Sequence, residues 1–203
     1  MSATTTGNSL PLDPSILASY RRRMRGELYA PDAVAIEETG CAYHQPYKEQ
    51  PALVARCLSA HDVALTIALA RELQLELAVY SGGYSQAGRH VSTGCLLVDL
   101  SQLRQITLDP LQRIARVEPG ATHDELARAA AAHGLATTGA SATVGMDGST
   151  DNILAFEVVN AEGTIITASA REHPDLFSAL CEGIDIFGVV TAITYRLHVS
   201  QTE

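Results

Sequence analysis

Apolar residues recur at helical spacing between Ser59 and Leu73, and short apolar runs flank this segment. Val63, Ile67 and Ala70 fall on one face of the expected helix, and Ser59 suits its N-cap position. The flanking runs predict strands, which we expect over Glu27 to Tyr29, Leu53 to Cys57, Leu75 to Val79 and Cys95 to Asp99. Strand, helix and strand in this order predict a small βαβ unit, whose last loop presents backbone N–H groups to a ligand.

From Gln105 onward the pattern is strand-rich and typical of an antiparallel sheet. We expect strands over Gln105 to Leu108, Arg113 to Val117, Ile153 to Val159, Thr164 to Ala168 and Val189 to His198. Asn160 to Gly163 predicts a hairpin turn between two of them. Thr122 and Glu125 form a capping box for a helix that Gly134 ends. A further short helix is expected from Pro174 and Asp175.

Together these elements predict an α+β fold of two subdomains with a cleft between them. Asp13 and Pro14 suit an N-cap and a first helical position, so ordered structure is expected to begin there, after a flexible tail over residues 1–12. We expect a βαβ subdomain with a glycine loop over residues 13–104, and a sheet-plus-helix subdomain over residues 105–203.

The composition is that of a globular chain without general affinity for polyanions. Hydrophobic residues make up 46% and charged residues 18% of the 203 residues, which excludes disorder over most of the length. The net charge of −9 gives no attraction to nucleic acid or to an anionic membrane. The exception is Arg21 to Arg25, which we interpret as solvated side chains at a helix end, the alternative being a phosphate or partner patch.

Neither the cysteines nor the histidines have the spacing of a metal site. Cys41, Cys57, Cys95 and Cys181 are scattered without a Cys-x-x-Cys pair, and the histidines lack a His-x-x-x-His pair. We therefore expect no metal, and a core position for Cys95. The sequence shows no signal peptide and no apolar run of the roughly 20 residues that a membrane helix needs, so a cytoplasmic location is expected.

A glycine-rich segment, Val79 to Gly88, follows one predicted strand and precedes another. Gly82, Gly83 and Gly88 allow backbone N–H groups to converge on an anion such as a pyrophosphate. The alternative is a tight connection that binds no ligand, because a single Gly-Gly pair is a weak signal.

Segments around this loop carry a resemblance to a known family. They are Pro51 to Cys57, Ser59 to Val63, Val98 to Ser101, Val117 to Thr122, His133 to Thr137, Pro174 to Phe177 and Phe187 to Thr191. In order and spacing they resemble the FAD-binding, PCMH-type domain of the vanillyl-alcohol-oxidase superfamily, most closely its berberine-bridge-enzyme-like branch. The resemblance runs from about residue 27 to residue 198 and implies that relatives hold FAD in the cleft between the subdomains.

Three departures from the family pattern change what the resemblance implies. Tyr80, Ser81 and Tyr84 stand where the family has an arginine, a glycine and the histidine that is joined to the flavin. A long glycine-rich stretch of the family is missing after Thr143, and bulky or acidic residues replace glycines between Cys181 and Gly188. The chain also ends where relatives begin a substrate-binding domain. A covalent histidyl-flavin bond is therefore excluded at position 84, and the flavin cleft is expected to be altered.

The candidate catalytic residues are Tyr84, Tyr80 and Asp185. A tyrosine hydroxyl donates a hydrogen bond without carrying charge at neutral pH, and Asp185 with Glu182 would form an acid/base pair. The alternatives are space-filling aromatic side chains and solvated loop acids. The candidate ligand-binding residues, should FAD or another ligand occupy the cleft, are Ser81, Gly82, Gly83, Ser85, Gln86, Gly88, Gly188 and Val189.

Three functions follow as hypotheses. The first is a non-redox cyclase or isomerase, including a [4+2] type, that needs no cofactor and folds an apolar or polyketide-like substrate in the vacated flavin cleft. The second is an oxidoreductase that binds FAD non-covalently, with a completing subunit for the missing parts of the site. The third is a non-catalytic binding or dimerisation module, which implies a homodimer.

Overall fold

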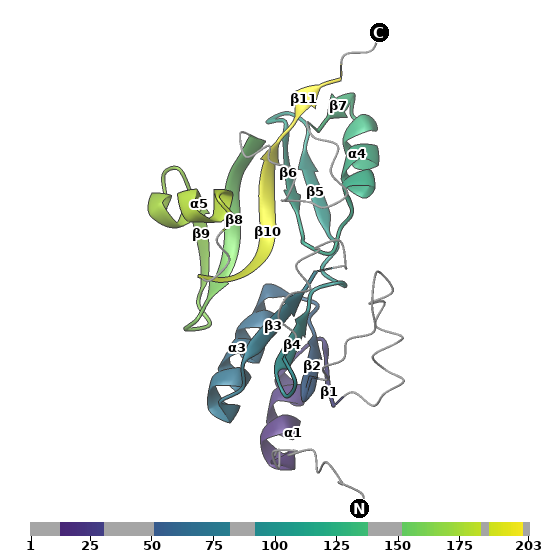
Figure 1. Cartoon of the computed structure of the whole chain (residues 1–203). Helices are drawn as coiled ribbons and strands as arrows, with labels where there is room; N and C mark the ends of the chain where they lie inside the picture. The colour runs from purple at the N-terminus through teal and green to yellow at the C-terminus, as the bar shows by residue number, and fades with distance from the viewer. Residues whose placement is uncertain (1–12, 31–50, 82–91, 138–151, 184–186, 201–203) are drawn as a thin grey trace, which may run out of the picture.

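The computed structural model of the chain describes residues 13–30, 51–81, 92–137, 152–183 and 187–200. Two sheets lie one above the other, with α1 at one end of the molecule and β11 at the other (Figure 1). Helices pack on both sheets, so the predicted α+β class is confirmed. The predicted tail over residues 1–12 and the glycine segment from Gly82 to Gly88 lie outside the described residues.

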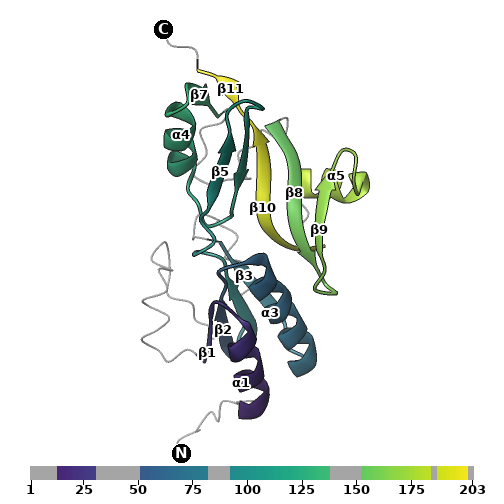
Figure 2. The same cartoon turned by 180° about the vertical axis from the view of Figure 1, so that it is seen from behind.

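The first sheet has four strands in the order β1, β2, β4, β3. Strands β2, β4 and β3 are parallel, and β1 joins β2 in antiparallel pairing. Helices α1 and α3 cover one face of this sheet (Figures 1 and 2). The elements are α1 (Pro14–Arg23), β1 (Glu27–Tyr29), β2 (Leu53–Arg56), α3 (Ala60–Leu73), β3 (Leu77–Tyr80) and β4 (Leu96–Asp99). This arrangement confirms the predicted βαβ unit and inserts β4 between its two strands.

The second sheet has five antiparallel strands in the order β5, β6, β10, β8, β9. Helix α4 packs over β5 and β6, and α5 packs over β8 and β9. A small pair, β7 with β11, completes this half. The elements are β5 (Ile106–Asp109), β6 (Ile114–Val117), α4 (His123–Ala131), β7 (Leu135–Ala136), β8 (Ile153–Asn160), β9 (Ile165–Ser169), α5 (Pro174–Cys181), β10 (Gly188–Arg196) and β11 (His198–Val199).

The two halves share one apolar core. Val159 of β8 and Val189 of β10 pack in the same cluster as the buried face of α3 and the inner residues of β2 and β4. A hydrogen bond of 3.4 Å from Arg71 of α3 to the carbonyl of Ala161 adds a contact at the hairpin between β8 and β9. The end of β8 and the start of β10 are therefore held against α3 mainly by burial of apolar surface.

Helix ends follow the predicted local signals. Asp13, Ser59 and Thr122 are N-caps, and each side chain accepts a hydrogen bond from a backbone N–H two or three residues later. Strand β3 begins at Leu77 rather than at the predicted Leu75. Gln74 takes a left-handed conformation at the end of α3, and the N–H of Leu75 bonds back to the carbonyl of Ala70, so these residues still belong to the helix cap.

The arginines of α1 are exposed, and their contacts stay within α1 and the strand that follows it. Arg21 donates to the carbonyl of Leu28 at 2.8 Å, and the guanidinium of Arg23 lies 5.2 Å from the ring centre of Tyr20. Their position in the last turn complements the helix dipole. These contacts favour the interpretation as solvated side chains over a ligand patch. Within the described ranges, no helix is long and apolar enough to cross a membrane.

The capping box of α4 makes a pH-dependent contribution to stability. The N–H of Thr122 binds the carboxylate of Glu125 and lowers its pKa, a shift reinforced by the Thr122 hydroxyl and by Arg104. Because the pKa is lower in the folded state, this contribution is present above the ordinary glutamate pKa of about 4.3 and is lost as the pH falls through the folded-state pKa.

Glu125→Gln should therefore lower the free energy of unfolding by about 0.5 kcal/mol at pH 7, because glutamine keeps the box geometry but loses the charge. Urea unfolding at pH 7 and pH 3 measures this difference, which should shrink at the lower pH. Glu162→Gln, in the exposed turn between β8 and β9, is the matched control and should change little at either pH. An equal loss for Glu125→Gln at both pH values would contradict the role of its charge.

Candidate functional site

A polar row crosses the first sheet where its parallel strands end. The strand registers place Glu27 of β1 opposite Arg56 of β2, Arg56 opposite Asp99 of β4, and Asp99 opposite Tyr80 of β3. Side chains of directly opposed residues point to the same face of a sheet. Three of the four residues are the last of their parallel strands, and this carboxyl edge is where open α/β sheets bind ligands.

The row lies on the face turned away from α1 and α3. Ala55 and Val98, the neighbours of Arg56 and Asp99 in their strands, belong to the core under these helices. The next residues on the polar face form an apolar cluster, against which Tyr29 and Tyr80 pack, made of Val54, Ala78, Cys95 and Leu97. The polar row therefore borders a buried apolar patch and stands at the rim of the sheet.

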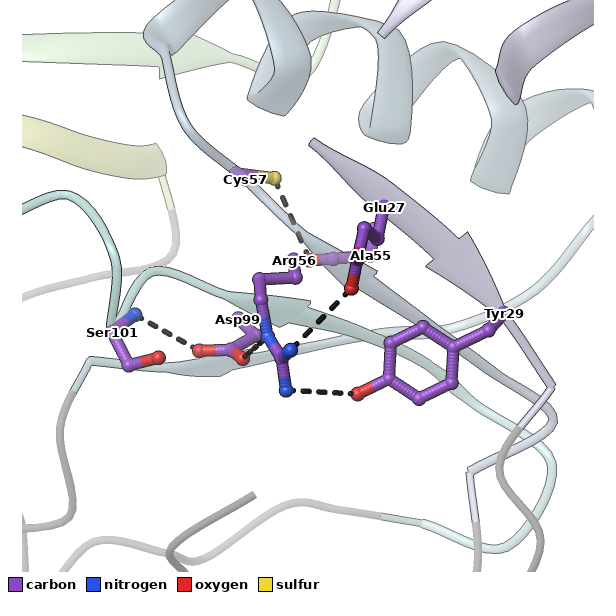
Figure 3. Close-up of polar contacts among 7 residues, drawn as sticks. All are labelled: Glu27, Tyr29, Ala55, Arg56, Cys57, Asp99 and Ser101. Carbon is purple, nitrogen blue, oxygen red and sulfur yellow. Dashed lines mark hydrogen bonds and ion pairs between the residues drawn. The ribbon is translucent and has the colours of Figure 1, made fainter. Parts of the chain in front are cut away.

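Arg56 is the centre of the row, as Figure 3 shows. Its Nε donates to Asp99 at 3.3 Å, one terminal nitrogen donates to Glu27 at 3.4 Å, and the other donates to the hydroxyl of Tyr29 at 3.3 Å. Partial burial alone lowers the pKa of Arg56, but the hydrogen bond to Asp99 and the neighbouring charges outweigh burial and raise the pKa above its ordinary value. The guanidinium is therefore a fixed positive charge at the carboxyl edge.

The buried carboxylate of Asp99 fixes the position of the Arg56 guanidinium. The side chain of Asp99 is fully buried, and its second oxygen accepts a hydrogen bond of 2.9 Å from the N–H of Ser101. Leu100, the residue after Asp99, donates its N–H to the carbonyl of Tyr80 at 2.7 Å. These bonds fix the end of β4 against β3 and hold the Asp99 carboxyl group under Arg56.

Cys57 follows Arg56 but points to the opposite face and has no role as a nucleophile. Burial raises the pKa of its thiol to about 12, and the contact with Thr66 opposes this shift only in part. The thiol lies 3.6 Å from the carbonyl of Ala55. A thiol protonated at neutral pH is inert, so Cys57 is a core residue. Cys95 is also buried, as predicted.

A second polar cluster lies on the five-stranded sheet. A β-bulge in β10 directs Thr191 toward Glu157, whose carboxylate accepts its hydroxyl at 2.8 Å. Arg116 donates to both oxygens of Glu157 at 2.9 Å. Arg116 and Glu157 carry opposite charges that neutralise each other. We therefore interpret this cluster as a structural one that stabilises the bulge in β10.

Gly188 and Val189, two predicted ligand-binding residues, have structural duties at the start of β10. A Cβ atom on Gly188 would lie 2.4 Å from the carbonyl oxygen of Val159, and φ at Gly188 is +155°. Only glycine fits this close approach of β10 to β8. Val189 is buried in the core under α3, whereas Tyr80 packs on the other face of the sheet. The structure thus separates Val189 from the face that carries Tyr80.

The remaining predicted residues divide into two groups. Tyr80 and Ser81 are described, and Tyr80 lies next to Asp99 at the carboxyl edge. Glu182 is exposed after α5. The others lie outside the described residues: Gly82, Gly83, Tyr84, Ser85, Gln86, Gly88 and Asp185. Among the described residues, no three His, Cys, Asp or Glu side chains gather as a metal site would require.

The sequence prediction missed the importance of Arg56 and Asp99. A signal was present, because each charged residue ends an apolar strand at the edge where βαβ units bind ligands. That Arg56 and Asp99 would face each other depended on β4 lying between β2 and β3, and this insertion is not visible in the order of elements along the chain.

Comparison with known proteins agrees with this fold. The family model described as an FAD binding domain matches residues 51–169. The (R)-6-hydroxynicotine oxidase of Paenarthrobacter nicotinovorans is 32% identical over 192 residues, covering 86% of this chain and 42% of the relative. A xylooligosaccharide oxidase of Thermothelomyces thermophilus is 30% identical over 166 residues, covering 72% of this chain and 33% of the relative.

Solved structures match over the same extent. The 6-hydroxy-D-nicotine oxidase of Arthrobacter nicotinovorans superposes with a TM-score of 0.77 at 30% identity, covering 87% of this chain and 43% of that one. A carbohydrate oxidase of Microdochium nivale shares the fold, with a TM-score of 0.79 at 21% identity and coverage of 91% and 43%. The chain spans less than half the length of each of these relatives.

Proposed function

The chain belongs to the FAD-binding domain family, and from this premise we propose that it is the FAD-holding part of an oxidoreductase that acts on a small organic molecule. This membership bears out the resemblance to the PCMH-type domain of the vanillyl-alcohol-oxidase superfamily. Because the chain spans less than half of its relatives, the activity of a whole oxidoreductase and its small-molecule substrate are part of this proposal.

The guanidinium of Arg56 at the carboxyl edge of the first sheet is the observation that carries this proposal. An FAD pyrophosphate is an anion, and Arg56 places a permanent positive charge where three parallel strands end. The donors at this edge therefore suit an extended, negatively charged cofactor.

The proposed contacts to FAD come from both halves of the chain. Ser81 follows β3 at this edge, and the segment after it offers backbone and side-chain donors to the pyrophosphate. Besides Ser81 we assign this role to Gly82, Gly83, Ser85, Gln86 and Gly88. Gly188 at the start of β10 is kept as a candidate for a backbone contact with the cofactor, whereas Val189 is not, because it is buried in the core under α3.

The catalytic assignment is narrower. FAD, when bound, supplies the two-electron acceptor that oxidation of a small molecule requires. Tyr84 takes the place of the family's flavin-linking histidine, so the cofactor is held without a covalent bond, and its hydroxyl would donate a hydrogen bond to the ligand. Tyr80 ends β3 next to Asp99 and lies at the same rim. Asp185 is retained as a candidate acid or base.

The oxidoreductase function is preferred to the flavin-free cyclase or isomerase. Several relatives are FAD-dependent or FAD-linked enzymes by name, among them an FAD-dependent monooxygenase of Cochliobolus heterostrophus at 31% identity over 165 residues. They support the alternative with FAD over the hypothesis without a cofactor. No contact among the described residues favours a cyclisation site. The named relatives are enzymes, so they give no support to a binding module without catalysis.

FAD binding is the decisive test. The purified 203-residue chain should bind FAD in an equimolar complex by calorimetry and become yellow. All of the flavin should leave the protein on acid precipitation, because position 84 offers no histidine for a covalent bond. A colourless protein that takes up no FAD would overturn the proposal and favour the flavin-free hypotheses. Flavin retained in the precipitate would show a covalent bond and overturn the non-covalent part of the proposal.

A further inference from the structure

We propose that Arg56 is the residue that selects phosphate-bearing flavin, and that Glu27 holds its guanidinium until the phosphate binds. The inference rests on the proposed FAD binding and adds a specificity-determining contact to it. Arg56 would keep its bond to Asp99 and exchange Glu27 for a pyrophosphate oxygen of FAD. Riboflavin, which has no phosphate, would gain nothing from this exchange.

The contacts of Arg56 leave room for a stronger partner. Its three polar contacts measure 3.3 to 3.4 Å, whereas charge-assisted hydrogen bonds of a guanidinium to an anion are typically about 2.7 to 2.9 Å. The side chain of Arg56 keeps 33% of its exposure, so an anion can reach it at the rim. The terminal nitrogen that leaves Glu27 can donate a charge-assisted hydrogen bond to a phosphate oxygen.

The two carboxylates around Arg56 differ in how firmly they are held. Asp99 is fully buried and also bound to the N–H of Ser101, so moving it would leave a buried polar group without its partner. Glu27 is 70% exposed and can turn into water at small cost. Asp99 is thus the permanent anchor, and Glu27 is the partner that a phosphate replaces.

The charges set the direction of the effect. Glu27, Arg56 and Asp99 together carry a formal charge of −1, and Glu27 competes with a phosphate both for the guanidinium and by repulsion between like charges. Removing the charge of Glu27 should therefore strengthen the binding of FAD. A purely structural Arg56 would show no such response.

Glu27→Gln is the first variant of the test, since an exposed substitution leaves the fold intact. Calorimetric titrations of the full chain with FAD and with riboflavin give the ratio of the two affinities. We expect FAD to bind about twofold to fivefold more tightly to the variant, the factor that corresponds to one exposed ion pair, with riboflavin unchanged.

The second variant is Arg56→Gln combined with Asp99→Asn, which removes both charges of the Arg56–Asp99 pair together and keeps a polar side chain at each position. FAD affinity should fall about tenfold to a hundredfold, with riboflavin affinity within a factor of about two, since one hydrogen bond to a charged group is lost. The double variant leaves the net charge unchanged, whereas Glu27→Gln removes one negative charge, so Glu162→Gln, which removes an exposed carboxylate elsewhere, is the control for net charge. Circular dichroism verifies the fold of each protein.

The outcomes separate the two proposals. If the wild-type chain binds FAD and both variants keep its ratio of FAD to riboflavin affinity, Arg56 has no part in selection and only this inference fails. The same conclusion follows if Glu162→Gln strengthens FAD binding as much as Glu27→Gln does. If the wild-type chain binds neither flavin, the proposed function fails and the role of Arg56 fails with it.

Discussion

Replacing Asp62 with alanine should lower the free energy of unfolding by about 3 to 5 kcal/mol, the largest loss expected from a single side chain here. Its carboxyl group is fully buried in the first turn of α3 and accepts three backbone N–H groups. They come from Arg25 at 2.9 Å, Gly26 at 3.2 Å and Leu58 at 2.9 Å. One side chain thus holds both the connection before β1 and the connection after β2.

Alanine would leave these three donors buried without an acceptor, and each such group costs about 1 to 3 kcal/mol. Urea unfolding monitored by circular dichroism measures the loss. Asp124→Ala is the matched control, because Asp124 also lies in the first turn of a helix but is exposed, and its loss should stay within about 0.5 kcal/mol. Equal stabilities of the two variants would show that the network of Asp62 contributes nothing.

Most of the elements could be predicted from local patterns in the sequence. Ser59 and Thr122 cap their helices as expected, and the turn after Asn160 joins β8 to β9 with Gly163 in a left-handed conformation. Such signals depend on a few neighbouring residues, so they survive without knowledge of the tertiary structure. Asp62 shows the limit. Its role could not be predicted from the sequence, where it looks like any acidic residue in the first turn of a helix, because its three hydrogen-bond partners lie up to 37 residues away in the chain.

The candidate site could be predicted only in part, for the same physical reason. Tyr80 was singled out from the family resemblance, and the structure places it at the carboxyl edge, whereas the glycine segment stays a prediction outside the described residues. The row of Arg56 with Asp99 depends on strand order, which the alternation of apolar residues does not encode. Gly188 was assigned to a ligand, yet the close approach of Val159 gives this glycine a structural reason of its own.

Gly26→Ala should destabilise the protein by about 3 kcal/mol and disturb the polar row at the same time. A Cβ atom at this position would lie 1.9 Å from the carbonyl oxygen of Arg56, far inside van der Waals contact. The obstacle is backbone within a paired strand, so no side-chain rotation relieves it. Strand β1 would have to move away from β2, which weakens the bond of Gly26 to Asp62 and separates Glu27 from Arg56.

The double consequence makes this variant informative about the site as well as the fold. Urea unfolding should give the loss of about 3 kcal/mol, whereas Gly94→Ala, with no atom within 4 Å of the added Cβ, should lose only about 1 kcal/mol for its left-handed φ of +86°. If Glu27 restrains Arg56, the Gly26→Ala protein that remains folded should resemble Glu27→Gln in its ratio of FAD to riboflavin affinity. A Gly26→Ala variant as stable as Gly94→Ala would mean that β1 is not held against β2 at this distance.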